Sequence, residues 1–239
     1  MDELLSRGLD MLLEQDQSLE PYLAGGGRIR LQELLEAYVR ELELFNPAYG
    51  LVGTEAHGEL IIKHILDSLA PLGPILGALD RGGSPLPSPT MADAGTGAGL
   101  PGLPLACALP EVQCTLIERM GRRVGFLQNT LAVLGVRNVR LEQADIEKAR
   151  SGPFDLITFR AFRPLEPPIL KALLRLLTPG GALAAYKGRL EKIQEEMRPI
   201  EPLIGNWKAI PLRVPFLEEE RHLVVIGGKN GSSLSADTE

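Results

Sequence analysis

The sequence predicts an α/β protein in which a helical extension precedes a parallel sheet that carries helices on both faces. From Met91 onward, short apolar runs of strand length alternate with longer amphipathic segments, which is typical of parallel sheets. Before residue 80, apolar residues recur at three- and four-residue steps, the period of a helix. We therefore expect a helical extension over residues 1–79, a Gly/Pro/Ser-rich linker over 80–90, a sheet domain over 91–228 and a disordered polar tail over 229–239.

Composition restricts the class of protein. With 239 residues and 44% apolar residues, the chain can bury one substantial core. We find no continuous apolar run of about eighteen residues, the length of a membrane span, and no basic segment followed by an apolar one at the N-terminus. We expect a cytoplasmic protein without a membrane partner, and we favour a monomer. Cys107 and Cys114 lie in no C-x-x-C pattern, so we expect buried apolar roles for them and no metal site.

Charge is distributed unevenly along the chain, although the net charge is −6. Residues 119–189 contain thirteen Arg and Lys against five Asp and Glu, whereas residues 1–80 contain five against fourteen. Such segregation can give an acidic protein a basic face that meets phosphate. The alternative is solvated charge scattered over the surface.

Three helices are expected in the N-terminal part. The first covers residues 3–24, and the second runs from about Leu31 until Pro47 ends it. The third covers residues 57–69 and contains His64 three residues before Asp67, so the Asp67 carboxylate is a candidate to orient the imidazole. Simple packing of His64 is the alternative.

The sheet domain begins a regular alternation of elements. We expect strands over 91–94, 113–117, 138–142, 154–159 and 181–186, helices over 100–109, 120–134 and 166–177, and an antiparallel hairpin over 207–228. Ligands of parallel sheets bind beyond the carboxyl ends of the strands. That edge collects Asp93, Glu118, residues 145–147 and Arg160, because each ends or follows an expected strand.

A glycine-rich turn follows the first expected strand. Gly95, Gly97 and Gly99 alternate, which allows positive φ angles and close approach of a ligand. Pro101 and Pro104 are tolerated only in a first helical turn. The start of that helix would attract an anionic group. Nucleotide-like ligands are the usual occupants of such turns.

Two ligand classes and a turn without ligand compete here. Residues 97–102 form G-x-G-x-x-G, and Glu118 follows about twenty residues later, where dinucleotide folds place their ribose-binding carboxylate. The turn equally resembles the D/E-x-G-x-G-x-G turn of class I AdoMet-dependent methyltransferases, with Asp93 and the three glycines in register. Residues 177–181, LTPGG, resemble the L-x-P-G-G turn of the same class and favour AdoMet (S-adenosyl-L-methionine). In either case Glu118 is the natural ligand of ribose hydroxyls.

Beyond the class, the chain from about Leu31 to Ile226 resembles one family, the bacterial small-subunit ribosomal RNA guanine-N-7 methyltransferases, known as the glucose-inhibited division protein B family. Besides LTPGG, five blocks in order carry the resemblance: KHILDS at 63–68, DAGTGAGLPGLP at 93–104, RAF at 160–162, YKG at 186–188 and ERHLVV at 220–225. The helix-to-turn segment departs from the family's W-N-x-x-x-N-L-T at Phe45, Gly50 and Val52.

The resemblance implies a Rossmann-like class I fold, AdoMet as cofactor and formation of 7-methylguanosine in small-subunit (16S) ribosomal RNA, with that RNA or the 30S particle as partner. It implies AdoMet contacts at Gly95, Leu100, Ile146, Glu147 and Arg160, to which the glycine motif adds Asp93, Gly97, Gly99 and Glu118. We hypothesise that phosphates or the guanine edge are held by Arg122, Arg123, Lys187, Arg221 and His222. The expected catalytic set is Arg160, Lys187 and Arg221.

The chemistry itself demands little of the side chains. Guanine N7 carries a free lone pair and no proton, so general base catalysis is not required. Positioning alone can supply about 7–11 kcal/mol. Two rival functions are an NAD-dependent oxidoreductase and a non-catalytic AdoMet-binding factor in ribosome assembly, which the departures at Gly50 and Val52 leave open.

Overall fold

The computed structural model describes residues 1–24, 27–80 and 88–227. Within these residues the sheet has seven strands in the order β3-β2-β1-β4-β5-β7-β6. Their bounds are β1 Thr90–Ala94, β2 Gln113–Glu118, β3 Val139–Gln143, β4 Phe154–Arg160, β5 Leu177–Lys187, β6 Trp207–Leu212 and β7 Arg221–Gly227. The first five strands are parallel, and β7 runs antiparallel to both β5 and β6. The predicted α/β sheet with a closing hairpin is confirmed.

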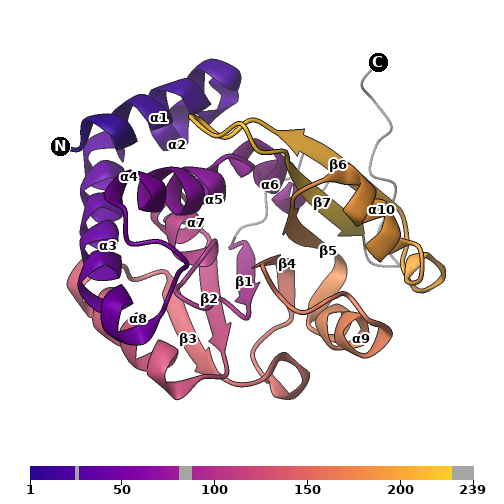
Figure 1. Cartoon of the computed structure of the whole chain (residues 1–239). Coiled ribbons are helices and arrows are strands. Elements are labelled where there is room, and N and C mark those ends of the chain that lie inside the picture. The colour runs from indigo at the N-terminus through magenta and orange to yellow at the C-terminus, as the bar shows by residue number, and fades with distance from the viewer. Residues whose placement is uncertain (25–26, 81–87, 228–239) are drawn as a thin grey trace.

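The strand order reverses at β1, which lies between β2 and β4 (Figure 1). Ligands of open α/β sheets bind at such a switch point, beyond the carboxyl ends of the strands. The glycine turn begins at this position, directly after Ala94. The one strand that differs clearly from its expected bounds is β5, which starts at Leu177 because Leu177 pairs with Phe154 before the register shifts.

Helices cover both faces of the sheet. One face carries α7 (Gly102–Ala108), α8 (Gly121–Leu134) and the N-terminal helices, and the other carries α9 (Pro167–Arg175) and α10 (Leu190–Met197) (Figure 1). Short 3₁₀ helices follow β3 (η4, Ile146–Lys148) and α10 (η5, Glu201–Leu203). Helix α10 was not predicted, because only Ile193 and Met197 of its eight residues are buried.

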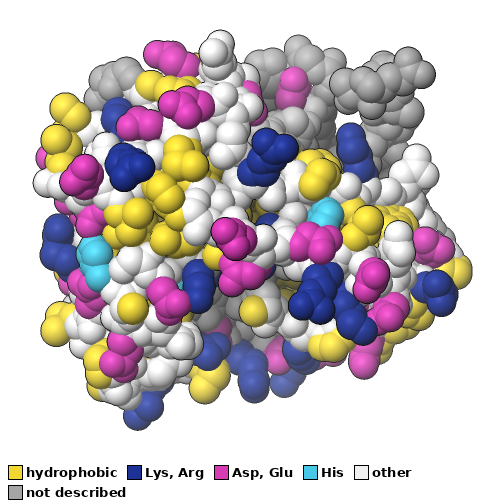
Figure 2. All heavy atoms as spheres, turned by 45° about the horizontal axis from the view of Figure 1, so that its top comes forward, with side chains coloured by type: hydrophobic (Ala, Val, Ile, Leu, Met, Phe, Trp, Pro, Cys, Tyr) yellow, Lys and Arg dark blue, Asp and Glu magenta, His cyan; other side chains and the backbone are white. Residues whose placement is uncertain are grey.

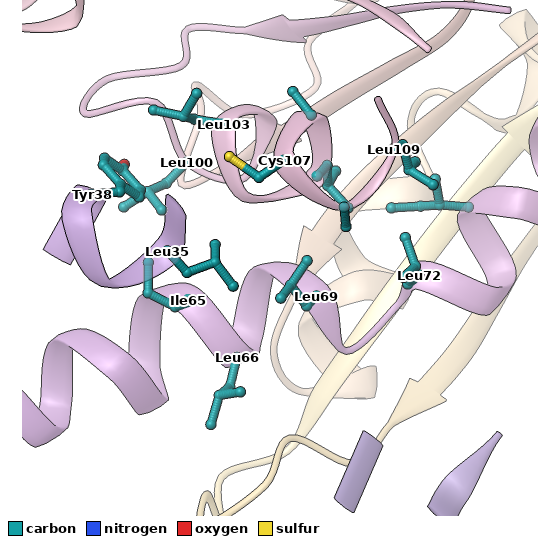
Figure 3. Packing of buried hydrophobic residues seen from close by; sticks show 14 of the residues in the cluster. Leu35, Tyr38, Ile65, Leu66, Leu69, Leu72, Leu100, Leu103, Cys107 and Leu109 are labelled. Atoms are coloured by element: carbon teal, nitrogen blue, oxygen red, sulfur yellow. The ribbon is translucent and has the colours of Figure 1, made fainter. Parts of the chain in front are cut away.

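The N-terminal helices are α1 Glu3–Gln15, η1 Gln17–Leu19, α2 Glu20–Leu23, α3 Arg28–Tyr49, α4 His57–Leu60, the π-helical η3 Ile61–Leu66, α5 Asp67–Leu69 and α6 Leu72–Leu79. They share one apolar core with the sheet domain. Figure 3 shows Leu35 and Tyr38 of α3 and Leu69 of α5 facing Leu103 and Cys107 of α7. The helical part is thus a packed layer over one face of the sheet.

Two predicted helix ends are wrong. The helix expected over 3–24 stops at Gln15, because Asp16 takes an extended conformation and its carboxylate accepts a hydrogen bond from the Ser18 amide. Pro47 does not end α3, because it removes only one donor and the helix continues to Gly50, which has a φ of 58°. Helix α6 was missed, since its Gly and Pro residues are weak helix formers.

The helical run His57–Leu79 is 23 residues long and has a mean hydropathy of 1.3, enough by length and composition to cross a membrane. It contains no continuous apolar run of that length, because Lys63, His64 and Asp67 interrupt the apolar residues. Its leucines and isoleucines, except the partly buried Ile62 and Leu76, are buried within the protein, so core packing accounts for most of the hydropathy.

The two cysteines are buried free thiols, as expected. The expected tail and most of the expected linker lie outside the described residues.

Candidate active site

A cavity of about 550 Å³ lies where the carboxyl ends of β1, β4 and β5 meet the N-terminal helices. The glycine turn after β1 forms one wall, and the ends of β4 and β5 with the start of β7 form a second. Residues 51–53, Arg123, Leu212 and the polar residues of the 57–69 helical run also line it. The cavity therefore combines the predicted ligand turn with segments that are distant in sequence.

The glycine turn adopts the backbone that its sequence predicts, with φ angles of 66° at Gly95, 62° at Gly97 and 99° at Gly99. A Cβ at Gly95 would lie 2.5 Å from the Phe162 ring, so a side chain there is excluded. A Cβ at Gly97 would meet no atom nearer than 3.8 Å, so the surface beside it is open. Gly95 and Gly97 line the cavity, whereas Gly99 packs against Leu127.

The buried Asp93 carboxylate holds this turn in place. Its carboxylate accepts hydrogen bonds from Thr96 Oγ1 at 2.5 Å and from the Gly102 amide at 2.9 Å. Burial raises the pKa of Asp93 to about 6, against the lowering effect of the Thr96 and Gly102 hydrogen bonds. Asp93 is fully buried and does not line the cavity. The anionic group at the start of α7 is therefore the protein's own carboxylate.

Glu118 ends β2 beside the turn, as predicted, and it is 3% exposed. Its two oxygens accept hydrogen bonds from the Gly97 amide at 3.0 Å and the Met120 amide at 2.8 Å. Arg123 Nη1 lies 3.9 Å from Glu118 Oε2. Arg123 lines the cavity and Glu118 does not. Glu118 thus fixes the turn from the β2 side.

Arg160, the last residue of β4, reaches across to the N-terminal helices. Its Nη1 donates to Asp67 Oδ2 at 2.6 Å and to the Lys63 carbonyl at 3.1 Å, and its Nη2 lies 3.2 Å from His64 Nδ1. Asp67 Oδ1 accepts from Arg221 Nε at 3.1 Å. The expectation that Asp67 could orient His64 is wrong, because the partner of both is Arg160.

His64 is in its neutral form at pH 7. Burial and the Arg160 guanidinium lower its pKa to about 4. A neutral imidazole has one acceptor nitrogen, and Nδ1 faces the guanidinium donor. His64 therefore accepts a hydrogen bond from Arg160 and adds no charge to the cavity.

The opposite wall comes from β5 and β7. Lys187 Nζ donates to both oxygens of Glu196 on α10, at 2.7 and 2.8 Å. His222 is buried, with Nδ1 2.7 Å from the Gly188 carbonyl. Tyr186 donates to the Ser68 carbonyl at 2.7 Å and joins this wall to the 57–69 run.

The predicted site residues fall into two groups. Those that line the cavity are Gly95, Gly97, Leu100, Arg123, Arg160, Lys187, Arg221 and His222. Those that do not are Asp93, Gly99, Glu118, Arg122, Ile146 and Glu147. The Arg122 guanidinium lies 5.3 Å from the Tyr49 ring centroid, and Glu147 on η4 lies 3.8 Å from Arg163. Lining residues that were not predicted include Thr96, Tyr186 and Asp67. For Asp67 the sequence signals were its spacing from His64 and the KHILDS block.

Charge around the site is mixed. On the face shown in Figure 2, Lys and Arg side chains lie among Asp and Glu side chains over most of the visible described surface. The charge segregation along the chain thus does not produce a continuous basic patch on this face. Within the described part of the chain, no group of three or more His, Cys, Asp and Glu side chains could hold a metal ion.

Comparison with known proteins identifies the family. Residues 31–224 match the family described as GidB, rRNA small subunit methyltransferase G. The chain belongs to this family. It is 43% identical over 197 residues to the ribosomal RNA small subunit methyltransferase G of Treponema pallidum (strain Nichols), covering 81% of this chain and 83% of the relative. The corresponding enzyme of Actinobacillus pleuropneumoniae serotype 5b (strain L20) is 36% identical over 226 residues, with coverage of 93% and 98%. The resemblance read from the sequence is confirmed.

Solved structures confirm the class I methyltransferase fold. A putative S-adenosyl-L-methionine-dependent methyltransferase from Methanococcus maripaludis superposes with a TM-score of 0.56 at 13% identity, covering 82% of this chain and 94% of that one. The tRNA (m1A58) methyltransferase TrmI from Aquifex aeolicus gives 0.51 at 17% identity, with coverage of 66% and 68%. At these identities the likeness concerns the fold alone.

Proposed function

We propose that this protein transfers a methyl group from AdoMet to N7 of a guanine in small-subunit (16S) ribosomal RNA. The observation that carries the proposal is the cavity, in which the open glycine turn of a class I fold faces the Arg160, Lys187 and Arg221 cations in a chain of this family. We propose that it acts in the cytoplasm on the RNA or the 30S particle. We also predict that the protein acts as a monomer; a measurement of its molar mass in solution by light scattering tests this.

The residues of the turn suit AdoMet. Gly97 presents open backbone to the cavity, and the Arg160 guanidinium stands at the end of the adjacent strand, where it can bind a carboxylate. We propose that the turn and Arg160 hold the methionine part of AdoMet. Glu118 ends β2, and Ile146 and Glu147 follow the neighbouring strand β3. These three residues remain our proposal for the adenosine part. When bound, AdoMet supplies an electrophilic methyl group.

Side chains of the cavity are proposed to bind and orient the target guanine. An arginine donor that binds guanine O6 orients the base while leaving N7 free to attack. No proton has to be removed from N7, so the neutral His64 is not needed as a base. The major groove of an RNA helix is too narrow for side chains, so we propose that the target guanine enters the cavity unpaired. Arg123, Lys187, Arg221 and His222 line the cavity and are proposed to hold the nucleotide, and Arg122 outside it to meet a phosphate.

Arg160→Ala tests the proposal. We expect loss of methyl transfer to 30S subunits by more than about 100-fold, since this side chain positions the reacting groups. The matched control is Arg140→Ala, on the edge strand β3 away from the cavity, which should retain activity. Wild-type activity in the Arg160→Ala variant would remove this residue from the site. Binding of AdoMet by the wild type without transfer to RNA would favour an assembly factor, and binding of NAD instead would favour an oxidoreductase.

A further inference from the structure

The Asp67 carboxylate lies where the N-terminal helices, β4 and β7 come together. One oxygen is 2.6 Å from Arg160 Nη1 and the other is 3.1 Å from Arg221 Nε. The side chain of Asp67 is 5% exposed, against 15% for Arg160 and 28% for Arg221. The carboxylate is therefore enclosed, and the two arginines extend from it toward the cavity that all three residues line.

This arrangement brings two like charges together. Two guanidiniums near one cavity repel each other, and the carboxylate between them offsets that repulsion. Each oxygen of Asp67 accepts a hydrogen bond from one arginine, so the two guanidiniums are held at a fixed spacing. His64 adds no further charge, because it is neutral. The cluster keeps one net positive charge, which suits an anionic or acceptor-rich ligand.

Further contacts make the position of Arg160 specific. Its remaining bonds go to the Lys63 carbonyl and to His64, one turn of the helical run before Asp67. Arg221 Nη1 donates to the Glu220 carbonyl at 3.1 Å. The helical extension therefore contributes the group that aligns residues from two strands of the sheet domain.

We propose that Asp67 is a positioning residue for methyl transfer. It fixes Arg160 and Arg221 in the orientation that brings the methyl donor and the target guanine into line. This inference rests on the proposed function. It assigns Asp67 no contact with substrate, so its effect passes through the two arginines.

Asp67→Asn is the first test, since it keeps the size of the side chain and removes the charge. In single-turnover assays with full-length protein, 30S subunits and saturating AdoMet, we expect the rate constant of methyl transfer to fall about 100-fold, the cost of misplacing reacting groups by about 1 Å. Stability alone is not diagnostic, because removing one partner of a buried ion pair destabilises any protein. Rates are therefore compared at a temperature where circular dichroism shows both proteins folded.

Asp155→Asn is the matched control. Asp155 is a buried aspartate at the opposite end of β4, where its carboxylate accepts hydrogen bonds from Thr90. This variant should lose stability and keep the wild-type rate constant. If Asp67→Asn does not fold, Asp67→Glu replaces it, because the glutamate keeps the charge and displaces the carboxylate; we expect it to fold and to lose rate.

A double-mutant cycle separates positioning from a general structural effect. If Asp67 acts through the arginines, Asp67→Asn should cost less in an Arg221→Ala background than in the wild type, by about threefold or more. Equal costs in both backgrounds would overturn the inference, as would an unchanged rate constant in folded Asp67→Asn. If the wild type itself transfers no methyl group to 30S subunits, the proposed function fails, and that result is distinct from failure of the inference.

Discussion

Gly102→Ala tests the claim that the buried Asp93 carboxylate holds the glycine turn in place. Gly102 is the first residue of α7, and its amide donates to the Asp93 carboxylate. A Cβ at this position would lie 2.6 Å from Asp93 Cβ, 2.6 Å from Leu116 Cδ2 and 2.9 Å from Asp93 Oδ2. Carbon atoms normally approach no closer than about 3.5 Å. Asp93 Cβ belongs to a central strand and cannot move away.

The expected cost has two parts. Overpacking a buried site costs about 1–3 kcal/mol, and displacing Asp93 weakens a charge-assisted hydrogen bond worth about 1.5–3 kcal/mol. We expect a loss of about 3 kcal/mol in the free energy of unfolding. For a chain of this size, that loss lowers the Tm by about 6–12 °C. AdoMet binding should weaken as well, because Asp93 also holds Thr96.

The assay is thermal and urea unfolding followed by circular dichroism, with AdoMet titration by calorimetry. Gly125→Ala in α8 is the control, because a Cβ there meets no atom within 4 Å. It should stabilise the protein by about 0.5–1 kcal/mol through helix propensity. A Gly102→Ala protein as stable as the wild type would refute the packing argument.

Two further predictions concern groups that border the site. Tyr38→Phe removes the buried hydroxyl that donates to the Ala98 carbonyl at 2.7 Å, so it should cost about 1 kcal/mol in urea unfolding; an unchanged midpoint would show that this link does not hold the turn. In an NMR titration of the imidazoles, His64 should titrate near pH 4, because burial and Arg160 disfavour its charged form. Since the unfolded chain takes up this proton near pH 6.5, His64 reduces stability as the pH falls from about 6.5 to 4. A midpoint near 6.5 would contradict the burial of His64.

The sheet domain was predictable because its signals are local. Alternating apolar runs and the turn residues define its strands and every helix except α10 within a short window. The helix ends in the N-terminal part were less accessible. They depend on the carboxylate of Asp16, which starts a new turn, and on Gly50, which ends α3 beyond Pro47. Neither effect is visible in apolar periodicity.

The site was predictable only in part, for a related reason. The glycine turn and Arg160 follow strands that the pattern locates. Asp67 pairs with Arg160 and Arg221, which lie 93 and 154 positions further along the sequence. Its role therefore arises only when the helices pack on the sheet. The position of Arg122 depends likewise on Tyr49 of α3, which no local pattern reveals.

The most direct test of the function is methylation of 30S subunits from cells that lack this protein. Purified protein and AdoMet labelled in the methyl group are added, and the ribosomal RNA is digested and mapped by mass spectrometry. We predict label at one guanine of the 16S RNA, as 7-methylguanosine, and none with Arg160→Ala. Absence of label from the RNA, or label on another base or atom, would contradict the proposed function.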